Sequence, residues 1–212
     1  MSNLIYLTNA RLSFPALVEA QTSKKFPNSP PMFSADFIIP MNDPALTQFM
    51  QEYANLAVAE WKENANAVMQ MIQQDRRARC FGQGSEKRSE TTLQVHPGYE
   101  GNAWIGAKNK SRPQMIRADG KPAANDMEAM EIARKMYGGC YVNAVVHPWI
   151  RTTNRGVSCD LVAIQFVKDG EPFGDATGAV DASGMFGAVA TAPAAAPAPA
   201  AMPFPPFMGM PQ

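Results

Sequence analysis

The feature that most constrains this chain is its C-terminal segment, residues 182–212, which contains no Asp, Glu, Lys, Arg or His. The segment consists largely of Ala, Pro, Met and Phe, and proline interrupts both helices and sheet ladders because it lacks a backbone donor. A segment of this composition cannot build a packed core of its own. We therefore expect residues 182–212 to be a disordered tail and residues 1–181 to form one folded domain.

The charge of the chain is unevenly distributed along its length. The net charge over 212 residues is zero, but residues 171–212 contain Glu171, Asp175 and Asp181 and no Lys or Arg. Residues 1–170 therefore carry all 19 basic residues and a small excess of positive charge. Because this excess is small, any contact with nucleic acid must come from local clusters of basic residues.

Several classes of protein are disfavoured by missing motifs. Cys80, Cys140 and Cys159 are widely spaced and form no CxxC pair, so neither a disulfide framework nor a zinc site is predicted. His96 and His147 are the only histidines and have no partner at ligand spacing. The chain contains no nucleotide-binding loop or nucleophile elbow. We expect neither an enzyme nor a protein with a metal or other cofactor.

The N-terminus lacks the basic start and apolar run of a signal peptide. No apolar stretch approaches the roughly 20 residues that span a bilayer. We therefore expect a soluble protein that acts in the cytoplasm of a cell.

The hydrophobic pattern predicts five strands and two helical regions. Alternating apolar residues and β-formers place the strands at residues 3–14, 32–40, 101–108, 140–150 and 156–167. Pro15 is expected to end the first strand, followed by a long polar loop. Apolar residues at three- and four-residue spacings predict one helix over residues 45–79, with a weak point at 64–66, and a second that begins at Asn125 or Asp126.

This order of elements is that of the OB-fold, a five-stranded Greek-key β-barrel with a helix between strands three and four. The long helix between strands two and three would be an insertion on the outside of the barrel. The last two strands would form a hairpin through residues 151–155. Other α+β arrangements allow the same order.

Basic residues stand beside aromatic residues in three regions of the chain. These are Lys24, Lys25 and Phe26 after the first strand; Trp104, Lys108, Lys110 and Arg112 around the end of the third; and Tyr141, Trp149, Arg151 and Arg155 on the fourth strand and its hairpin loop. Single-stranded nucleic acid requires this combination, because cations contact phosphates and exposed rings stack on bases. In an OB-fold the loops joining strands one to two and four to five flank the ligand groove.

Each of these signals also has a purely structural interpretation. Charged loops are commonly solvated surface, and a tryptophan on a strand is commonly half-buried core, so Trp104 is compatible with either role. The fourth strand distinguishes its two faces better. Tyr141 and Trp149 share a face with polar residues, whereas Val142 and Val146 share an apolar face. This alternation favours an outward Trp149.

Five segments in series resemble a phage family long described only as a domain of unknown function. They are residues 9–20, 32–43, 97–122, 136–149 and 156–174. Members of this family are OB-fold single-stranded-DNA-binding proteins, similar in design to those of short-tailed coliphages. Proteins of this class usually end in an acidic tail with an aromatic tip, which recruits replication partners and competes with DNA. Here the tail keeps Phe204 and Phe207 but has no acid.

The resemblance and the residues together predict a DNA-binding phage protein that coats and protects single-stranded DNA, with little sequence preference, during DNA replication, recombination or repair in the host cytoplasm. The basic residues would contact phosphates, and Trp104, Tyr141 and Trp149 would stack on bases. Replication or recombination proteins recruited by the tail, and a homo-oligomer, are compatible with this role. The alternative is a phage structural or adaptor protein that docks through its Pro/Phe-rich tail.

Overall fold

The computed structural model describes residues 4–23 and 27–173. The chain divides into one unit over Met1–Gly174 and a second over Asp175–Gln212. Lys24, Lys25, Phe26 and the predicted tail at 182–212 lie outside the described residues. The boundary predicted at residue 181 therefore stays a prediction.

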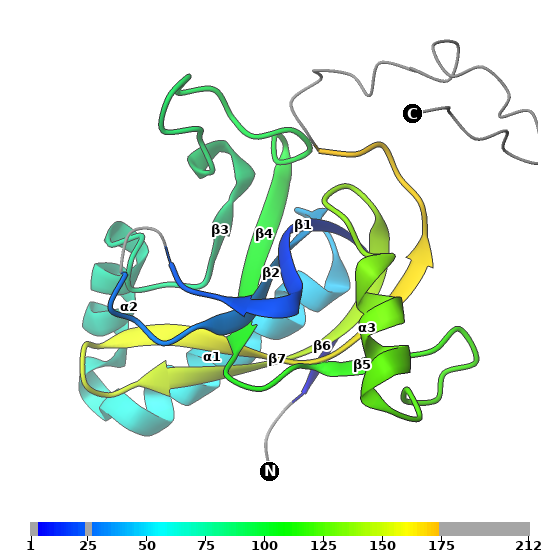
Figure 1. Ribbon diagram of the computed structural model, residues 1–212. Helices are drawn as coiled ribbons and strands as arrows, with labels where there is room; N and C mark the ends of the chain where they lie inside the picture. The colour runs from blue at the N-terminus through cyan, green and yellow to red at the C-terminus, as the bar shows by residue number, and fades with distance from the viewer. Residues whose placement is uncertain (1–3, 24–26, 174–212) are drawn as a thin grey trace, which may run out of the picture. The chain divides into compact units, whose positions relative to one another are not determined.

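Five long strands form a closed barrel (Figure 1). They are β1 (Ile5–Gln21), β2 (Met32–Pro40), β4 (Asn102–Asn109), β6 (Tyr141–Arg151) and β7 (Gly156–Lys168). β1 pairs antiparallel with β2 and β6, β2 pairs with β4, and β6 pairs with β7. A parallel contact that places Lys108 of β4 beside Asp160 of β7 closes the barrel. The predicted five-stranded barrel is confirmed.

β1 is longer than predicted because it does not end at Pro15. Asn9 and Phe14 have positive φ angles, and the register with β2 shifts between Ser13 and Ala16. These irregularities bend the strand and interrupt its ladder, where a proline is tolerated. The polar loop between β1 and β2 therefore begins only after Gln21.

The long helical region is divided in two, at the weak point predicted from the sequence. It comprises α1 (Pro44–Trp61), a short 3-10 turn η1 (Lys62–Asn64) and α2 (Ala65–Gln74). Phe49, Tyr53 and Ala57 are the buried side of α1, which packs against β6 and β1. The insertion thus covers part of the barrel from outside. α2 ends at Gln74, so residues 75–79 are not part of the helix predicted there.

The remaining elements are short and lie between the barrel strands along the chain. β3 (Phe81–Gln83) pairs with β4 and leads into η2 (Gly84–Glu86), and β5 (Gln114–Ile116) pairs with β7. The predicted second helix is α3 (Asp126–Arg134), and the side chain of Asn125 caps it by accepting a hydrogen bond from the Glu128 amide. None of the helices in the described ranges has the length and apolar character needed to cross a membrane.

The described residues contain two hydrophobic clusters. The larger one fills the barrel and the space under α1, and it includes Leu12, Phe37 and Ile105, all fully buried. The smaller one consists of Ile38, Tyr99 and Trp104, with Val95 and Phe173 packed against it. We call this smaller group the outer cluster, because it lies on the side of β2 and β4 that faces away from the barrel interior.

Candidate nucleic-acid interface

The outward face of β2 and β4 forms the floor of the candidate interface. Three pairs of residues face each other across these strands: Ser34 and Lys108, Asp36 and Gly106, and Ile38 and Trp104. Because successive side chains point to opposite faces of a strand, these pairs lie on one side, and the buried Ala35, Phe37 and Ile39 lie on the other. The outer cluster covers the Ile38–Trp104 end, and the Ser34–Lys108 end is open.

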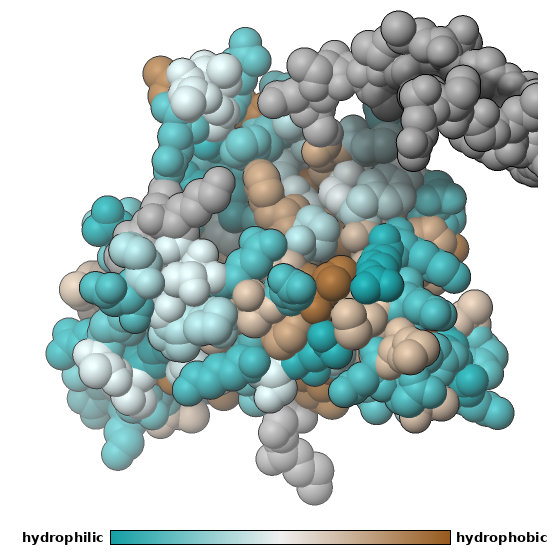
Figure 2. All heavy atoms as spheres, viewed as in Figure 1, coloured by the Kyte–Doolittle hydropathy of each residue, from teal (hydrophilic) through white to brown (hydrophobic). Residues whose placement is uncertain are grey.

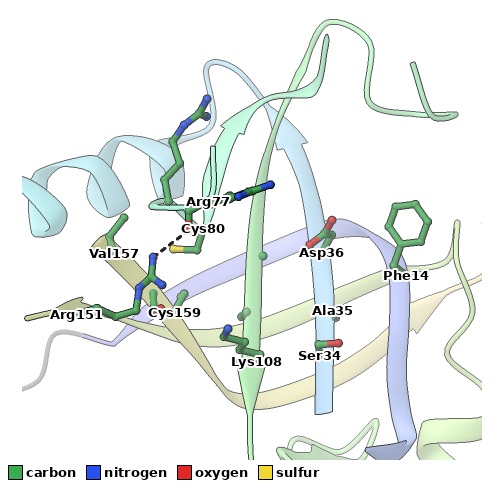
Figure 3. Close-up of a pocket in the computed structure, with 14 residues that line it drawn as sticks. Phe14, Ser34, Ala35, Asp36, Arg77, Cys80, Lys108, Arg151, Val157 and Cys159 are labelled. Atoms are coloured by element: carbon green, nitrogen blue, oxygen red, sulfur yellow. Dashed lines mark hydrogen bonds between the residues drawn. The ribbon is translucent and has the colours of Figure 1, made fainter. Parts of the chain in front are cut away.

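The open end of this face lines a pocket of about 260 Å³ (Figure 3). Its walls come from four parts of the fold: β1, β2 with β4, the segment that follows α2, and the β6–β7 hairpin. Its lining side chains include Phe14, Ser34, Asp36, Arg77, Arg79, Lys108 and Arg151. Figure 2 shows one face of the molecule, on which hydrophilic residues predominate and apolar residues form smaller groups between them. We call this pocket the barrel groove.

Positive charge dominates the barrel groove, which has four basic side chains and a single acidic one. The acidic residue, Asp36, accepts hydrogen bonds from Lys87 Nζ and from the Tyr99 hydroxyl at 3.0 Å. Lys87 therefore compensates its charge locally. Glu86 compensates Arg79 in the same way, so Arg77, Lys108 and Arg151 are the groove cations that set the potential an anionic ligand would meet.

Two of the four cations are held by the protein itself. Arg79 is nearly buried, pairs with Glu86 at 2.7 Å and donates to the carbonyl of Phe81 at 2.9 Å. Arg151 Nη2 donates to the carbonyl of Arg77 at 3.1 Å, which ties the β6–β7 hairpin to the segment after α2 (Figure 3).

The other two cations are exposed. Among residues 4–23 and 27–173, neither Arg77 nor Lys108 has an ion-pair partner. Their side chains are therefore the ones available to a ligand.

The remaining predicted cations have different surroundings. Lys110 and Arg155 are exposed, and Arg155 has a positive φ at the tip of the hairpin. Arg112 is half-buried, donates to the carbonyl of Val18 at 3.0 Å and lies over the ring of Phe33. Because its guanidinium serves these contacts, it is less free to contact a phosphate than its sequence neighbours.

Trp104 requires a correction. Its side chain is only 4 % exposed, enclosed by Ile38 and Tyr99, and Lys87 Nζ lies 3.7 Å from the ring centroid. Although the strand directs this ring outward, residues 84–101 cover it. The exposed position that base stacking requires is absent, and the prediction of a stacking role for Trp104 is wrong.

Trp149 and Tyr141 lie on the mixed face of β6, and the alternation predicted for that strand is confirmed by its burial pattern. Trp149 is 37 % exposed, and its indole donates to Asp160 at 2.8 Å. Trp149 is opposite Ser158 in the β6–β7 ladder, and Ser158 lines the groove, so Trp149 lies close to its rim. Tyr141 lies eight residues away along the strand, about 26 Å by strand geometry. Its ring is covered by Lys168 and approached by Arg11.

Sequence reasoning missed Phe14 and Arg77. Phe14 lines the groove with 55 % of its surface exposed, although it stands inside an apolar strand. The only sign of its role in the sequence is its position between Ser13 and Pro15, where the alternation of apolar and polar residues along β1 is interrupted. Arg77 was assigned to the last turn of a helix, but α2 ends before it.

Burial raises the pKa values of two tyrosine hydroxyls and a cysteine thiol in the barrel unit. Burial, followed by the nearby Asp36 carboxylate, raises the pKa of the Tyr99 hydroxyl far above its usual value. Burial also raises the pKa of Tyr53 to about 12 and lifts the pKa of the Cys159 thiol, next to Cys80, well above normal. Among the described residues, no three His, Cys, Asp or Glu side chains are grouped as a metal would require.

A closed five-stranded Greek-key barrel with a basic groove across its outer face defines an OB-fold protein of the oligonucleotide-binding class. The comparisons with known proteins make the assignment narrower. The family model described as "Enterobacter phage Enc34, ssDNA-binding protein" matches residues 3–192, and the chain belongs to this family.

Individual relatives agree with the family assignment. Putative protein p50 of Acyrthosiphon pisum secondary endosymbiont phage 1 is 31 % identical over 174 residues, which cover 80 % of this chain and 85 % of that protein. The single-stranded-DNA-binding protein of bacteriophage Enc34 in complex with ssDNA has a TM-score of 0.62 at 22 % identity, over 81 % of this chain and 89 % of the other. The same phage protein in a second structure has a TM-score of 0.58 at 24 % identity, over 86 % and 89 %. At these identities the two structures support the fold.

Proposed function

We propose that this chain binds single-stranded DNA across the barrel groove, with little sequence preference, and protects it during phage DNA replication, recombination or repair in the host cytoplasm. The observation that carries the proposal is the open basic groove over β2 and β4. It lies where OB-folds bind oligonucleotides. Membership of a family named for ssDNA binding supports the same ligand.

The groove fits a polyanion that has no fixed shape. Arg77 and Lys108 are exposed and line the groove from different elements, the segment after α2 and the strand β4, so each can contact a phosphate of the bound strand. Lys110 and Arg155 add exposed positive charge. Contacts to phosphates carry no sequence information, which is why we propose binding without sequence preference. The proposed activity is binding alone and includes no catalytic step.

The test is a titration with oligothymidine at several salt concentrations. Binding is measured in two ways, by quenching of intrinsic tryptophan fluorescence and by gel shift. The affinity should fall linearly with salt on a logarithmic scale, with a slope of about −0.7 per neutralised phosphate of a single strand. The double variant Arg77→Ala/Lys108→Ala should bind more weakly and show a flatter slope. The matched control Lys121→Ala/Arg134→Ala removes the same charge from exposed positions outside the groove.

Two results would contradict this proposal. One is a wild-type chain that shows neither quenching nor a gel shift. The other is a groove variant whose affinity and salt slope equal those of the control variant.

We further propose that the tail, residues 182–212, recruits replication or recombination proteins through its Pro- and Phe-rich tip. Because the DNA site is assigned to the barrel, deletion of residues 188–212 should leave the affinity for oligothymidine in place. Loss of DNA binding on deletion would move the site to the tail. No contact among the described residues favours the structural or adaptor alternative.

A further inference from the structure

Phe14 has a backbone conformation that its residue type disfavours. Its φ angle is +46°, in the left-handed region, where the Cβ atom of an L-residue crowds the following carbonyl. Glycine, Asn and Asp adopt this region more readily, yet the position holds a large aromatic residue. Non-glycine residues in such conformations cluster at functional sites, where the strain places a side chain that the regular strand would direct elsewhere.

The strain places the Phe14 ring at the mouth of the barrel groove rather than in a core. The side chain is 55 % exposed. The ring of His96 meets it edge-on, with centroids 5.1 Å apart and planes at 81°, and Tyr99 lies 6.3 Å away. These two neighbours restrict the ring orientation but leave more than half of its surface uncovered. An aromatic side chain that is oriented and still uncovered is suited to stack on a second flat ring.

The arrangement of charge decides which part of a nucleotide would meet this ring. Phe14 and Asp36 lie on one side of the groove, and Arg77 and Arg151 lie on the other (Figure 3). Lys87 compensates the charge of Asp36, so the Phe14 side of the groove offers a phosphate no net positive charge, whereas a neutral base needs none. Phosphates are therefore favoured beside the arginines, and a base is favoured beside Phe14.

We propose that Phe14 is a stacking platform for one unpaired base of the strand whose phosphates contact Arg77 and Lys108. This inference rests on the proposed function and specifies its base-binding position. The ligand chemistry is any nucleobase in a single strand, because every base offers a flat face and stacking discriminates little between them.

Tyr6 provides a matched control on the same strand. It is 53 % exposed, nearly the same fraction as Phe14, but it lines a different pocket with Asn143 and Val145. If exposed aromatic residues on β1 affected DNA binding only through protein stability or nonspecific hydrophobic contact, substitution of Tyr6 and substitution of Phe14 would change the affinity equally. The comparison therefore separates stacking in the groove from nonspecific effects.

The experiment combines removal of the ring with removal of the base. Wild type, Phe14→Leu, Phe14→Tyr and Tyr6→Leu are titrated with oligothymidine and with an abasic oligonucleotide of the same length. One stacked base is worth roughly 1–3 kcal/mol, about 5- to 150-fold in affinity. The affinity of Phe14→Leu for oligothymidine should be lower than that of wild type by this factor. Its affinity for the abasic strand should equal that of wild type. Phe14→Tyr and Tyr6→Leu should bind like wild type, and the salt slope should be unchanged in all four.

The outcomes separate this inference from the function on which it rests. If wild type binds neither strand, both fail. If wild type binds with a steep salt dependence but Phe14→Leu matches it on oligothymidine, or loses equally on both strands, only the stacking role fails. Phe14→Gly checks the fold, because glycine accepts this φ without strain. Weakened binding with an undiminished unfolding temperature supports the proposal, and a lowered temperature with normal binding assigns Phe14 to packing.

Discussion

The two ends of the outward face of β2 and β4 are built from the same strands and in the same register, yet they have opposite environments. At one end, Ser34 and Lys108 face an open groove. At the other end, Ile38 and Trp104 are each only 4 % exposed. The strands do not distinguish the two ends. The difference comes from the chain segments that cross over one of them.

Two segments cover the closed end. Residues 84–101, which project beyond the barrel in Figure 1, place Tyr99 over the face. The chain after β7 adds Phe173, whose amide donates to the carbonyl of Gly138 at 2.7 Å. Gly98, with φ +79°, admits this ring closely, since a Cβ there would lie 2.4 Å from it. Exposure on this barrel is therefore decided by connecting segments, and strand periodicity only selects the face.

Replacement of Trp104 by alanine should have the largest effect on stability. Removing a buried indole leaves a cavity in the outer cluster, so the free energy of unfolding should fall by about 3–5 kcal/mol. Ser34→Ala, at the open end of the same face, should change it by less than about 1 kcal/mol. Urea denaturation of the two variants measures the contrast. Equal, small effects would mean that the closed end is not packed as a core.

Gly106→Ala should have the next largest effect, because Gly106 lies where the open and closed ends meet. An added Cβ would lie 2.7 Å from Asp36 Oδ1 and 3.3 Å from the Trp104 ring. Asp36 is held by Lys87 and Tyr99 and cannot move without losing those bonds. The free energy of unfolding should fall by about 1–3 kcal/mol. The loss should shrink when Asp36→Ala is present, and a loss that is independent of Asp36 would refute this account.

Tyr99→Phe tests the polar link between the two ends. The variant loses the hydroxyl that donates to Asp36, which should cost about 1 kcal/mol near pH 8. Burial, and then the Asp36 carboxylate, raises the pKa of the Tyr99 hydroxyl in the folded state. The stabilisation of the folded state by the protonated Tyr99 is therefore fully present below the unfolded-state pKa of about 10 and is lost as the pH rises above that value. Wild type should therefore lose more stability than Tyr99→Phe between about pH 8 and pH 11. Parallel pH profiles would contradict this assignment.

Trp149→Ala should have the smallest effect on stability and contrasts an exposed indole with the covered one. Its ring is 37 % exposed and contributes little to the core, so the free energy of unfolding should change by about 0.5 kcal/mol. The fluorescence quenching caused by oligothymidine should diminish, because Trp149 lies at the groove rim and Trp104 is shielded. Undiminished quenching in this variant would place the responding indole elsewhere.

The sequence was sufficient for the barrel, the divided helix and the outward face of β6, because each depends on local periodicity. The sequence did not predict the burial of Trp104. Residues 84–101, which cover its ring, have no hydrophobic period that would indicate that they pack on the barrel. Phe14 was missed because a bulge arises from pairing between two strands, and one strand alone does not show it. Arg77 was misassigned because Asp75 ends α2 in a local turn, in which the Arg77 amide donates to the Asp75 carboxylate, and the helical spacing of apolar residues does not reveal that turn.

The closure of the barrel gives the groove one further property. β4 and β7 meet at a single registered pair, Lys108 and Asp160, so the sheet has its sparsest hydrogen bonding at that seam. The groove spans the seam, with Lys108 on one side and Val157 on the other. A flexible polymer bound in the groove would contact both sides of the β4–β7 seam and hold the two strands together. Occupancy and closure would then be linked, so that bound ligand raises the free energy needed to open the seam.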